Sequence, residues 1–524
     1  MHLDMIVRPP FYITTPIYYV NDVPHIGHMY TTLACDVIAR FKRLDGYDVR
    51  FLTGTDEHGQ KVQKAAAAAG LSPQEFTDKV SANFRELGVR MNFSNEDFIR
   101  TTEPRHQRAC MALWERLTER DQIYLRTYAG WYAVRDEAFY AEAELSKSAS
   151  GDWIAPTGAP VEWVEEPSYF FRLSHWQERL LRFYEEQPEF ILPATRRNEV
   201  ISFVRSGLQD LSVSRTTFDW GIPVPGDPAH VMYVWLDALT NYLTAVGFPD
   251  TQGEPFTTYW PADLHMVGKD ILRFHAVYWP VLLMAADLPP PRRVFAHGWW
   301  TNEGRKISKS VGNVIDPKDL IDRYGLDPVR YFMMREVPFG QDGDFSHRAM
   351  VGRINGDLAN DFGNLAQRVL SMIGRYCERR VPIPSGFAAG DLALLNAASG
   401  LLERIRAHID KQALHSALID MWEVIAAANG YVAKQAPWTL RKNKPARMQT
   451  VLFVAAETLR RLALLAQPFM PQSASHMLDQ LCIPKDTRTF ASMTADEAVL
   501  PGTLLPTASA VFPRYVEHAD SASA

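Results

Sequence analysis

Apolar strand patterns alternate with helical patterns in two separate stretches of the chain, 1–122 and 218–344, and this alternation is what most constrains the fold. In the first stretch the aromatic and β-branched segment FYITTPIYY precedes a helical pattern from Met29 to Leu44, which meets Gly46, a residue type common at helix ends. Strands that alternate with helices pair in parallel through right-handed crossovers. We therefore predict an α/β domain with a parallel sheet, built from two halves.

The two halves are separated by a segment of different character, 123–217, in which short aromatic strands such as YAGWYAV and EAFYAEAEL follow one another. We predict that it forms a mixed α+β insertion. After Asp344 the strand patterns stop and apolar residues keep a helical spacing, which predicts an all-α bundle of about five helices over 345–505. A C-terminal tail, 506–524, follows, and its last residues, VEHADSASA, are expected to be disordered.

Composition restricts the class of protein. The 524 residues are 47% hydrophobic and 22% charged, which is typical of a soluble protein of several domains. We see neither a signal peptide nor an apolar run near the ~20 residues that a membrane span needs, and we expect a cytoplasmic protein without membrane contact. A net charge of −6 gives no support to nonspecific coating of nucleic acid, but it leaves local recognition possible.

The sequence NDVPHIGHMY places His25 and His28 around Gly27, where the first strand ends and the helix begins. Unpaired N–H groups at a helix start can hold a phosphate, so the motif predicts an anion site. H-x-G-H alone also fits histidines that only form structural hydrogen bonds near a turn. On this motif alone both interpretations stay open.

A second polar motif, KISKS, occupies 306–310 in a glycine-flanked segment that we interpret as an exposed loop. Lysine ammonium groups and serine hydroxyls are suited to clamping a polyphosphate. In isolation the motif fits a solvated basic loop better.

The two motifs together, in this order on an interrupted α/β domain, resemble the class I aminoacyl-tRNA synthetases, with Ile307 where that class has methionine in its KMSKS-type loop. The resemblance is closest to the methionyl-tRNA synthetase family. It rests on five segments in order: YITTPIYYVNDVPHIGH, FLTGTDEHG, YVWLDAL, MVGKDILRFHAVYWP and QAPW. It implies a Rossmann-like catalytic domain, the insertion, and a helical anticodon-binding domain.

The resemblance also implies the reaction: L-methionine and ATP give methionyl-adenylate and pyrophosphate, and methionine then passes to the 2′-hydroxyl of the terminal adenosine of tRNA(Met), for initiation and elongation of translation. Mg²⁺ is expected with the nucleotide. The implied catalytic residues are His25, His28, Lys306 and Lys309. The implied ATP-binding residues are Gly27, His28, Gly268, Asp270, Ser308 and Lys309. Such chemistry is positioning plus electrostatic stabilisation and needs no side-chain nucleophile, so Cys35 and Cys110 are assigned to packing.

The amino acid pocket is implied by the same family. Its expected lining is Ile17, Tyr19, Asp56, Trp235, Ala238, Tyr242, Ile271 and His275. Aromatic walls suit a polarizable thioether, and Asp56 would pair with the substrate ammonium. Leu239 stands where many family members have proline. The alternative for each residue is core packing, and a lone histidine facing a core is more often structural.

The tRNA contacts that the resemblance implies lie in the helical region, where Asn364, Arg368 and Trp438 would read the CAU anticodon. Amide and guanidinium groups bond to base edges, and an indole stacks on a splayed base. The alternative is an ordinary exposed helix pair, because Asn364 and Arg368 are four residues apart.

The chain departs from many family members in its cysteines. The four, Cys35, Cys110, Cys377 and Cys482, are far apart, and none lies between Cys110 and Cys377, where many members have a zinc knuckle. Asp136, Glu137 and Glu142 are better explained as a solvated strand face, since structural zinc prefers sulfur and imidazole. We predict no structural zinc and, without an extra C-terminal dimerising domain, a monomer.

Three other functions stay open at this point. A synthetase for isoleucine, valine or leucine would carry a larger editing insertion. A small-molecule nucleotidyltransferase can share H-x-G-H but has no use for the helical region. A non-enzymatic RNA-binding paralogue would not need both histidines and both lysines.

Overall fold

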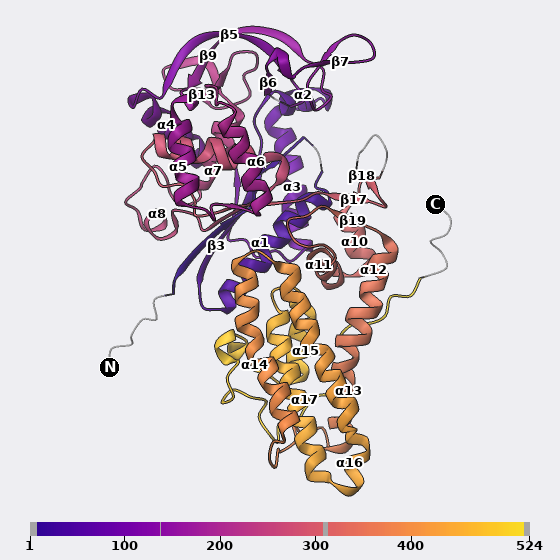
Figure 1. The fold of residues 1–524 in the computed structure, drawn as a ribbon. Coiled ribbons are helices and arrows are strands. Elements are labelled where there is room, and N and C mark those ends of the chain that lie inside the picture. Colours follow the sequence, from indigo (N-terminus) through magenta and orange to yellow (C-terminus); the bar gives the residue numbers. More distant parts are fainter. Residues whose placement is uncertain (1–7, 22, 137, 308–312, 518–524) are drawn as a thin grey trace.

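The structure is a computed structural model that describes residues 8–21, 23–136, 138–307 and 313–517 (Figure 1). Its described residues include a seven-stranded sheet in which every pair is parallel. The strand order is β10 (Ile191–Leu192), β16 (Val294–His297), β15 (Leu264–Gly268), β1 (Pro10–Thr14), β3 (Asp48–Asp56) and β2 (Tyr18–Tyr19), with β4 (Asp97–Arg100) also paired to β3. The predicted parallel α/β domain built from two halves is confirmed, since β15 pairs with β1.

Helix α1 (Ile26–Leu44) packs against this sheet and is buried along most of its length. Gly46 has φ of +90° just beyond its end, as the sequence predicts for a helix terminus. The helices α2 (Gln60–Ala68), α3 (Pro73–Arg90) and α4 (Pro104–Glu119) complete the first half. In the second half α7 (Val234–Thr244) packs against α4, so the two halves share one core.

The insertion is an antiparallel sheet with helices beside it. Its strands are β5 (Ile123–Ala133), β6 (Ala138–Tyr140), β9 (Glu162–Phe171) and β11 (Leu211–Ser212), and its helices are α5 (Gln177–Glu186) and α6 (Ala194–Arg205). The mixed α+β prediction is therefore confirmed. The prediction that EAFYAEAEL is one strand is wrong, because after β6 the chain turns into a short 3-10 helix at Glu142–Glu144. Strand β10, also within 123–217, pairs with the catalytic sheet.

The segment before the second motif is a hairpin and not only a loop. Strand β17 (Trp300–Asn302) pairs with β18 (Arg305–Lys306) on one side and with β19 (Gly343–Phe345) on the other. Positive φ values at Glu303 and Gly304 make the tight turn between β17 and β18. The loop predicted for NEGRKISKSVGN, 302–313, is thus wrong for Asn302, Arg305 and Lys306, which lie in strands, while 308–312 lie outside the described residues.

The described residues after Phe345 form helices joined by loops, and they contain no strand apart from one isolated bridge between Arg380 and Leu504. Helix α12 (His347–Arg353), a π-helix (Ile354–Gly363) and α13 (Asn364–Tyr376) follow one another without a break. The bundle continues with α14 (Ala389–Asp410), α15 (Leu414–Gln435), α16 (Pro437–Asn443), α17 (Pro445–Ala466) and α18 (Pro471–Gln480), and Figure 1 shows it projecting away from the sheet with α16 at its far end. The all-α prediction is confirmed.

The bundle and the catalytic domain share apolar packing. One continuous core joins α1 to α11 (Leu326–Arg335), α15 and α17. Within it the buried guanidinium of Arg330 bonds to the carboxylate of Asp36 on α1 at 2.7 Å and to the backbone oxygen of Phe469 at 2.9 Å. Two further bonds, to the backbone oxygens of Met91 and Pro468, offset the cost of burying this charge, and the contacts join the bundle to the helix that carries the histidine motif.

Candidate active site

The histidine motif forms the start of helix α1. His25 is the N-cap, and its Nδ1 accepts a hydrogen bond from the backbone N–H of Gly27 at 3.0 Å. The backbone N–H of His25 in turn donates to Nδ1 of His28 at 3.1 Å. This reciprocal pair is a capping box made of two imidazoles. Gly27 is required because a Cβ at this position would lie 2.9 Å from Cε1 of His25.

The hydrogen bonds fix the tautomer of both rings. Since each Nδ1 accepts from a backbone N–H, the proton of each neutral imidazole is on Nε2. Burial lowers the pKa of His25, partly offset by the carboxylate of Asp270. Burial, and then the neighbouring His25, hold the pKa of His28 well below its ordinary value. At neutral pH the site therefore presents two uncharged Nε2–H donors.

Asp270 lies near this pair, just after strand β15. Gly268, the last residue of β15, leaves room for it, because a Cβ on Gly268 would lie 2.5 Å from Oδ1 of Asp270. That same oxygen accepts a hydrogen bond from the indole N–H of Trp299 at 3.2 Å. His297 also belongs here, because its Nε2 lies 2.7 Å from the hydroxyl of Thr31 on α1. Gly268 and Asp270 are thus brought to the histidine motif.

Sequence reasoning did not assign a role to His297 and Trp299. Both lie in the segment RVFAHGWW: His297 is the last residue of β16 and Trp299 follows it closely, at the sheet edge where β15 also ends. The carboxyl ends of neighbouring parallel strands meet, so their polar residues converge. That position was the signal that could have identified them.

The predicted methionine pocket contains a hydrogen-bonded pair, Tyr242 and His275. The Tyr242 hydroxyl lies 2.7 Å from Nε2 of His275, and Nδ1 of His275 lies 3.0 Å from the backbone oxygen of Ile271. With Nδ1–H donating to that carbonyl, Nε2 accepts from the tyrosine. Burial lowers the pKa of His275 to about 4, partly offset by the Ile271 carbonyl, so the ring is neutral. His275 sits in a short π-helix (Phe274–Tyr278), which widens the turn that carries it.

An aromatic stack lies beside this pair. The rings of Trp235 and Phe274 are parallel, with centroids 3.4 Å apart. Trp235, Ile17 and Ile271 all pack on the core that contains Tyr242. Phe274 was not predicted, although DILRFH places it next to His275 on the same turn.

The remaining predicted lining residues lie at the end of strand β3 and on α7. Asp56 is the last residue of β3, buried, and paired in register with Tyr19 of β2. Ala238 is buried on α7, one turn before Tyr242. The structure thus places Tyr19 beside Asp56, and Ala238 on the helix of Trp235 and Tyr242.

A buried acid between two histidines stabilises this region. The carboxylate of Asp237 bonds to His58 at 2.6 Å and to His106 at 2.7 Å, joining the segment just after β3 to α4 and α7. Burial raises the pKa of Asp237, but His58 and His106 outweigh it and bring the pKa to about 2. Sequence reasoning missed this contact because the three residues are far apart along the chain.

The residues of the second motif are described only in part. Lys306 ends strand β18, with its backbone in register with Thr301. Ser308 and Lys309 lie outside the described residues.

The predicted anticodon residues meet on the bundle. Asn364 is exposed as the first residue of α13. One turn later the guanidinium of Arg368 lies over the indole of Trp438, 5.8 Å from the ring centroid. Trp438 is 43% exposed, so the indole offers a free surface at the far end of the bundle.

Metal-binding groups are scarce in the part of the chain that the structure describes. One trio of side chains there, His106, Cys110 and Asp237, is compact enough to hold an ion, and it is buried in the catalytic domain. Its members already bond to one another, with Nε2 of His106 2.7 Å from Asp237 and 3.2 Å from the Cys110 sulfur. In the insertion, Asp136 accepts a hydrogen bond from Tyr140, Glu142 is exposed, and Glu137 lies outside the described residues.

Two family models match the chain. One, described as "tRNA synthetases class I (M)", matches residues 11–370, and the other, "Anticodon binding domain of methionyl tRNA ligase", matches residues 381–522. The chain belongs to the methionyl-tRNA synthetase family. Its fold and enzyme class are those of this class I family: a methionine–tRNA ligase that uses ATP, with a parallel-sheet catalytic domain and a helical anticodon-binding domain.

Relatives of this methionyl-tRNA synthetase match it almost end to end. A methionine–tRNA ligase of Brucella suis biovar 1 is 58% identical over 510 residues, which is 97% of this chain and 99% of that protein. The Mycobacterium tuberculosis enzyme in complex with methionyl-adenylate is 55% identical, with a TM-score of 0.94, over 97% of this chain and 100% of that one. Its free form has 51% identity and a TM-score of 0.89, over 99% and 100%. In the described residues of this methionyl-tRNA synthetase, no helix is sufficiently long and apolar to cross a membrane.

Proposed function

We propose that His25 and His28 activate methionine as a pair of neutral hydrogen-bond donors. The methionine carboxylate attacks the α-phosphorus of ATP, the bond to the β-phosphate oxygen breaks, and pyrophosphate leaves. Negative charge grows on the oxygens of the transferring phosphorus, and the two Nε2–H groups bond to it. The observation that supports this role most is the use of both Nδ1 atoms by the backbone, which leaves each Nε2–H for the substrate.

The other ATP contacts divide between the two ends of the nucleotide. Gly268 and Asp270, beside the histidines, bind the ribose, and Gly27 gives the phosphates close access to the helix start. Lys306, Ser308 and Lys309 hold the departing β- and γ-phosphates. Mg²⁺ comes with the nucleotide and is held mainly by its phosphates.

Methionine binds between the Trp235–Phe274 stack and the Tyr242–His275 pair. The thioether packs on aromatic rings, which favours it by about 0.3–1.5 kcal/mol for a good contact. Asp56 takes the substrate ammonium, and Ile17, Tyr19, Ala238 and Ile271 complete the walls. The M. tuberculosis complex with methionyl-adenylate, with its TM-score of 0.94, supports the same intermediate here.

In the second step the 2′-hydroxyl of the terminal adenosine of tRNA(Met) attacks the methionyl carbonyl carbon, and AMP leaves. Initiator and elongator tRNA(Met) are both substrates. Asn364, Arg368 and Trp438 read the CAU anticodon, supported by the exposed indole of Trp438 beside Arg368.

The domain boundaries proposed are 1–122 and 218–344 for the catalytic domain, 123–217 for the insertion, 345–505 for the anticodon-binding domain and 506–524 for the tail. We propose a cytoplasmic monomer without a structural zinc.

The test is ATP–pyrophosphate exchange by the variant His25→Asn. Asparagine is a good N-cap, so α1 keeps its start while the imidazole donor is lost. Exchange is expected to fall about 100-fold or more, which is typical for one lost donor to a reacting oxygen. His476→Asn is the matched control, because His476 is exposed on α18. Equal exchange by His25→Asn and the control would refute the donor role.

A further inference from the structure

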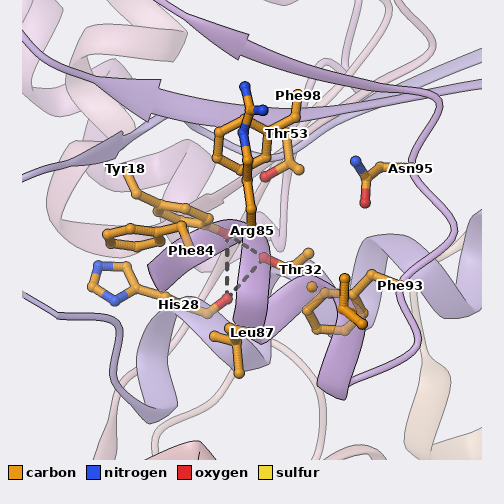
Figure 2. A pocket seen from close by; sticks show the side chains of 12 residues that line it. Tyr18, His28, Thr32, Thr53, Phe84, Arg85, Leu87, Phe93, Asn95 and Phe98 are labelled. Atoms are coloured by element: carbon orange, nitrogen blue, oxygen red, sulfur yellow. Dashed lines mark hydrogen bonds between the residues drawn. The ribbon is translucent and has the colours of Figure 1, made fainter. Parts of the chain in front are cut away.

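A pocket of about 190 Å³ lies behind the histidine motif, between α1, α3 and the sheet edge at β4 (Figure 2). Its lining is mainly apolar and includes several aromatic rings, and its polar members include Arg85, Thr32, Thr53 and Asn95. Figure 2 shows the rings of Tyr18, Phe84, Phe93 and Phe98 around it together with Asn95. Neighbouring residues of α1 face different sides, because Thr31 bonds to His297 whereas Thr32 bonds to Tyr18 at 2.7 Å on the pocket side. The pocket thus lies on a different side of α1 from His297, and His28 is one of the residues that line it.

One residue that lines this pocket, Gly88, has no side chain. It lies within α3, where glycine is less stable than alanine by about 1 kcal/mol. Its φ is not positive, and a Cβ would meet no atom within 4 Å. Neither backbone conformation nor crowding requires glycine here. Its absent side chain leaves this part of the pocket lining as bare backbone.

His28 lines the pocket together with the residues that hold its ring and its backbone. The His28 ring lies against Tyr18, with centroids 4.8 Å apart, and against Phe84, at 5.2 Å. The backbone oxygen of His28 accepts from the Tyr18 hydroxyl at 3.2 Å and from Thr32 at 2.9 Å. A molecule in the pocket would touch the side chains that orient His28.

We propose that this pocket is a second ligand site, for a small, uncharged, planar aromatic molecule, and that its occupancy changes the rate of adenylate formation through His28. An engineered apolar cavity of about 150 Å³ binds benzene, so the volume here suits one or two fused rings. Aromatic walls prefer an offset or edge-on aromatic partner. The amide of Asn95 uses one hydrogen on the backbone oxygen of Asp97, so it can still bond to one polar group on the ligand.

This inference goes beyond the proposed function, and binding is measured separately from activity. Indole is the probe, titrated calorimetrically onto the full chain with methionine at saturation, so that the methionine pocket is occupied. The test variant is Gly88→Leu, which fills the pocket with a side chain that helices favour. The matched control is Gly400→Leu, at an exposed glycine of α14 whose Cβ would also meet no atom within 4 Å. Both variants are expected to fold, since each replaces a helical glycine.

We expect saturable binding by the wild type and Gly400→Leu, and binding at least about tenfold weaker by Gly88→Leu. At saturating indole the methionine-dependent exchange rate should change about twofold or more in the first two proteins and stay unchanged in Gly88→Leu. Equal binding by Gly88→Leu, no binding by the wild type, or competition with methionine would overturn the site. Gly88-dependent binding with unchanged exchange would overturn the coupling to His28.

Discussion

The backbone N–H of His25 donates to Nδ1 of His28 at 3.1 Å, and the two imidazole centroids are 3.9 Å apart. One histidine thus orients the other, while its own Nδ1 caps the helix through Gly27. The motif is therefore a structural cap. Capping through Nδ1 leaves each Nε2–H for the phosphate role that we propose, so the two interpretations of H-x-G-H are compatible.

The variant Gly27→Ala tests this arrangement. The new Cβ would lie 2.9 Å from Cε1 of His25 and displace the ring. Since small misplacements of catalytic groups are costly, exchange should fall about tenfold or more, while stability changes by less than about 1 kcal/mol because alanine favours the helix. Gly430→Ala, in α15 with open space at its Cβ, should keep full activity. Normal exchange in Gly27→Ala would show that the ring position does not matter.

The variant Tyr242→Phe tests the methionine pocket. It leaves the buried Nε2 of His275 without its donor, which costs about 1–3 kcal/mol of stability. We expect KM for methionine to rise about tenfold, with KM for ATP unchanged, because the proposed function assigns this pair to the amino acid and not to the nucleotide. Tyr184→Phe is the control, since it also loses a buried hydroxyl bond, to the backbone oxygen of Ala276. If both variants raise KM for methionine equally, the effect is general loosening and the pocket assignment fails.

The contact between Arg368 and Trp438 predicts that removing either side chain lowers aminoacylation of tRNA(Met) without lowering pyrophosphate exchange. Arg368→Ala and Trp438→Ala should each lower kcat/KM for aminoacylation of tRNA(Met) about tenfold, because base stacking on an aromatic ring is worth about 1–3 kcal/mol. Pyrophosphate exchange, which needs no tRNA, should not change. The double variant should lose less than the sum, since the two groups interact. Arg375→Ala, exposed on the same helix, is the control, and an equal loss there would indicate only general charge attraction.

His275 predicts a dependence of stability on pH. Burial brings its pKa to about 4, below the value of about 6.5 for an unfolded histidine, so the unfolded chain binds the proton first as the pH falls. The contribution of His275 to the unfolding free energy is therefore complete well above pH 6.5 and decreases as the pH falls below that value. Between pH 7.5 and 5.5 His275 should account for about 1 kcal/mol of lost unfolding free energy. Urea unfolding at the two pH values measures this. From pH 7.5 to 5.5 the unfolding free energy of His275→Gln should decrease by about 1 kcal/mol less than that of the wild type. An identical decrease in both proteins would contradict the low pKa of His275.

Local patterns predicted much of the fold. The strand before His25, the helix that ends at Leu44 before Gly46, and the helical bundle after Asp344 depend on short-range periodicity and on residue conformation, which a sequence displays directly. Strand β10 was not recognised, because two residues carry no pattern and its partner β16 is about 100 residues away.

The site was less predictable than the fold. The family resemblance supplied the residue types, but the Asp237 contacts with His58 and His106 and the stack of Phe274 on Trp235 arise from packing between distant segments. The π-helical turn at His275 has no signature in the periodicity, yet it sets the position of that ring.

The central claim is that this site makes methionyl-adenylate and that its amino acid pocket selects methionine over the other amino acids. The most direct measurement is ATP–pyrophosphate exchange without tRNA, with methionine and with each other amino acid, in the wild type and in Lys309→Ala. The account predicts exchange with methionine alone, and loss of about 100-fold in the variant because the departing phosphates lose a positive charge. Comparable exchange with isoleucine, valine or leucine, or no exchange with any amino acid, would contradict it.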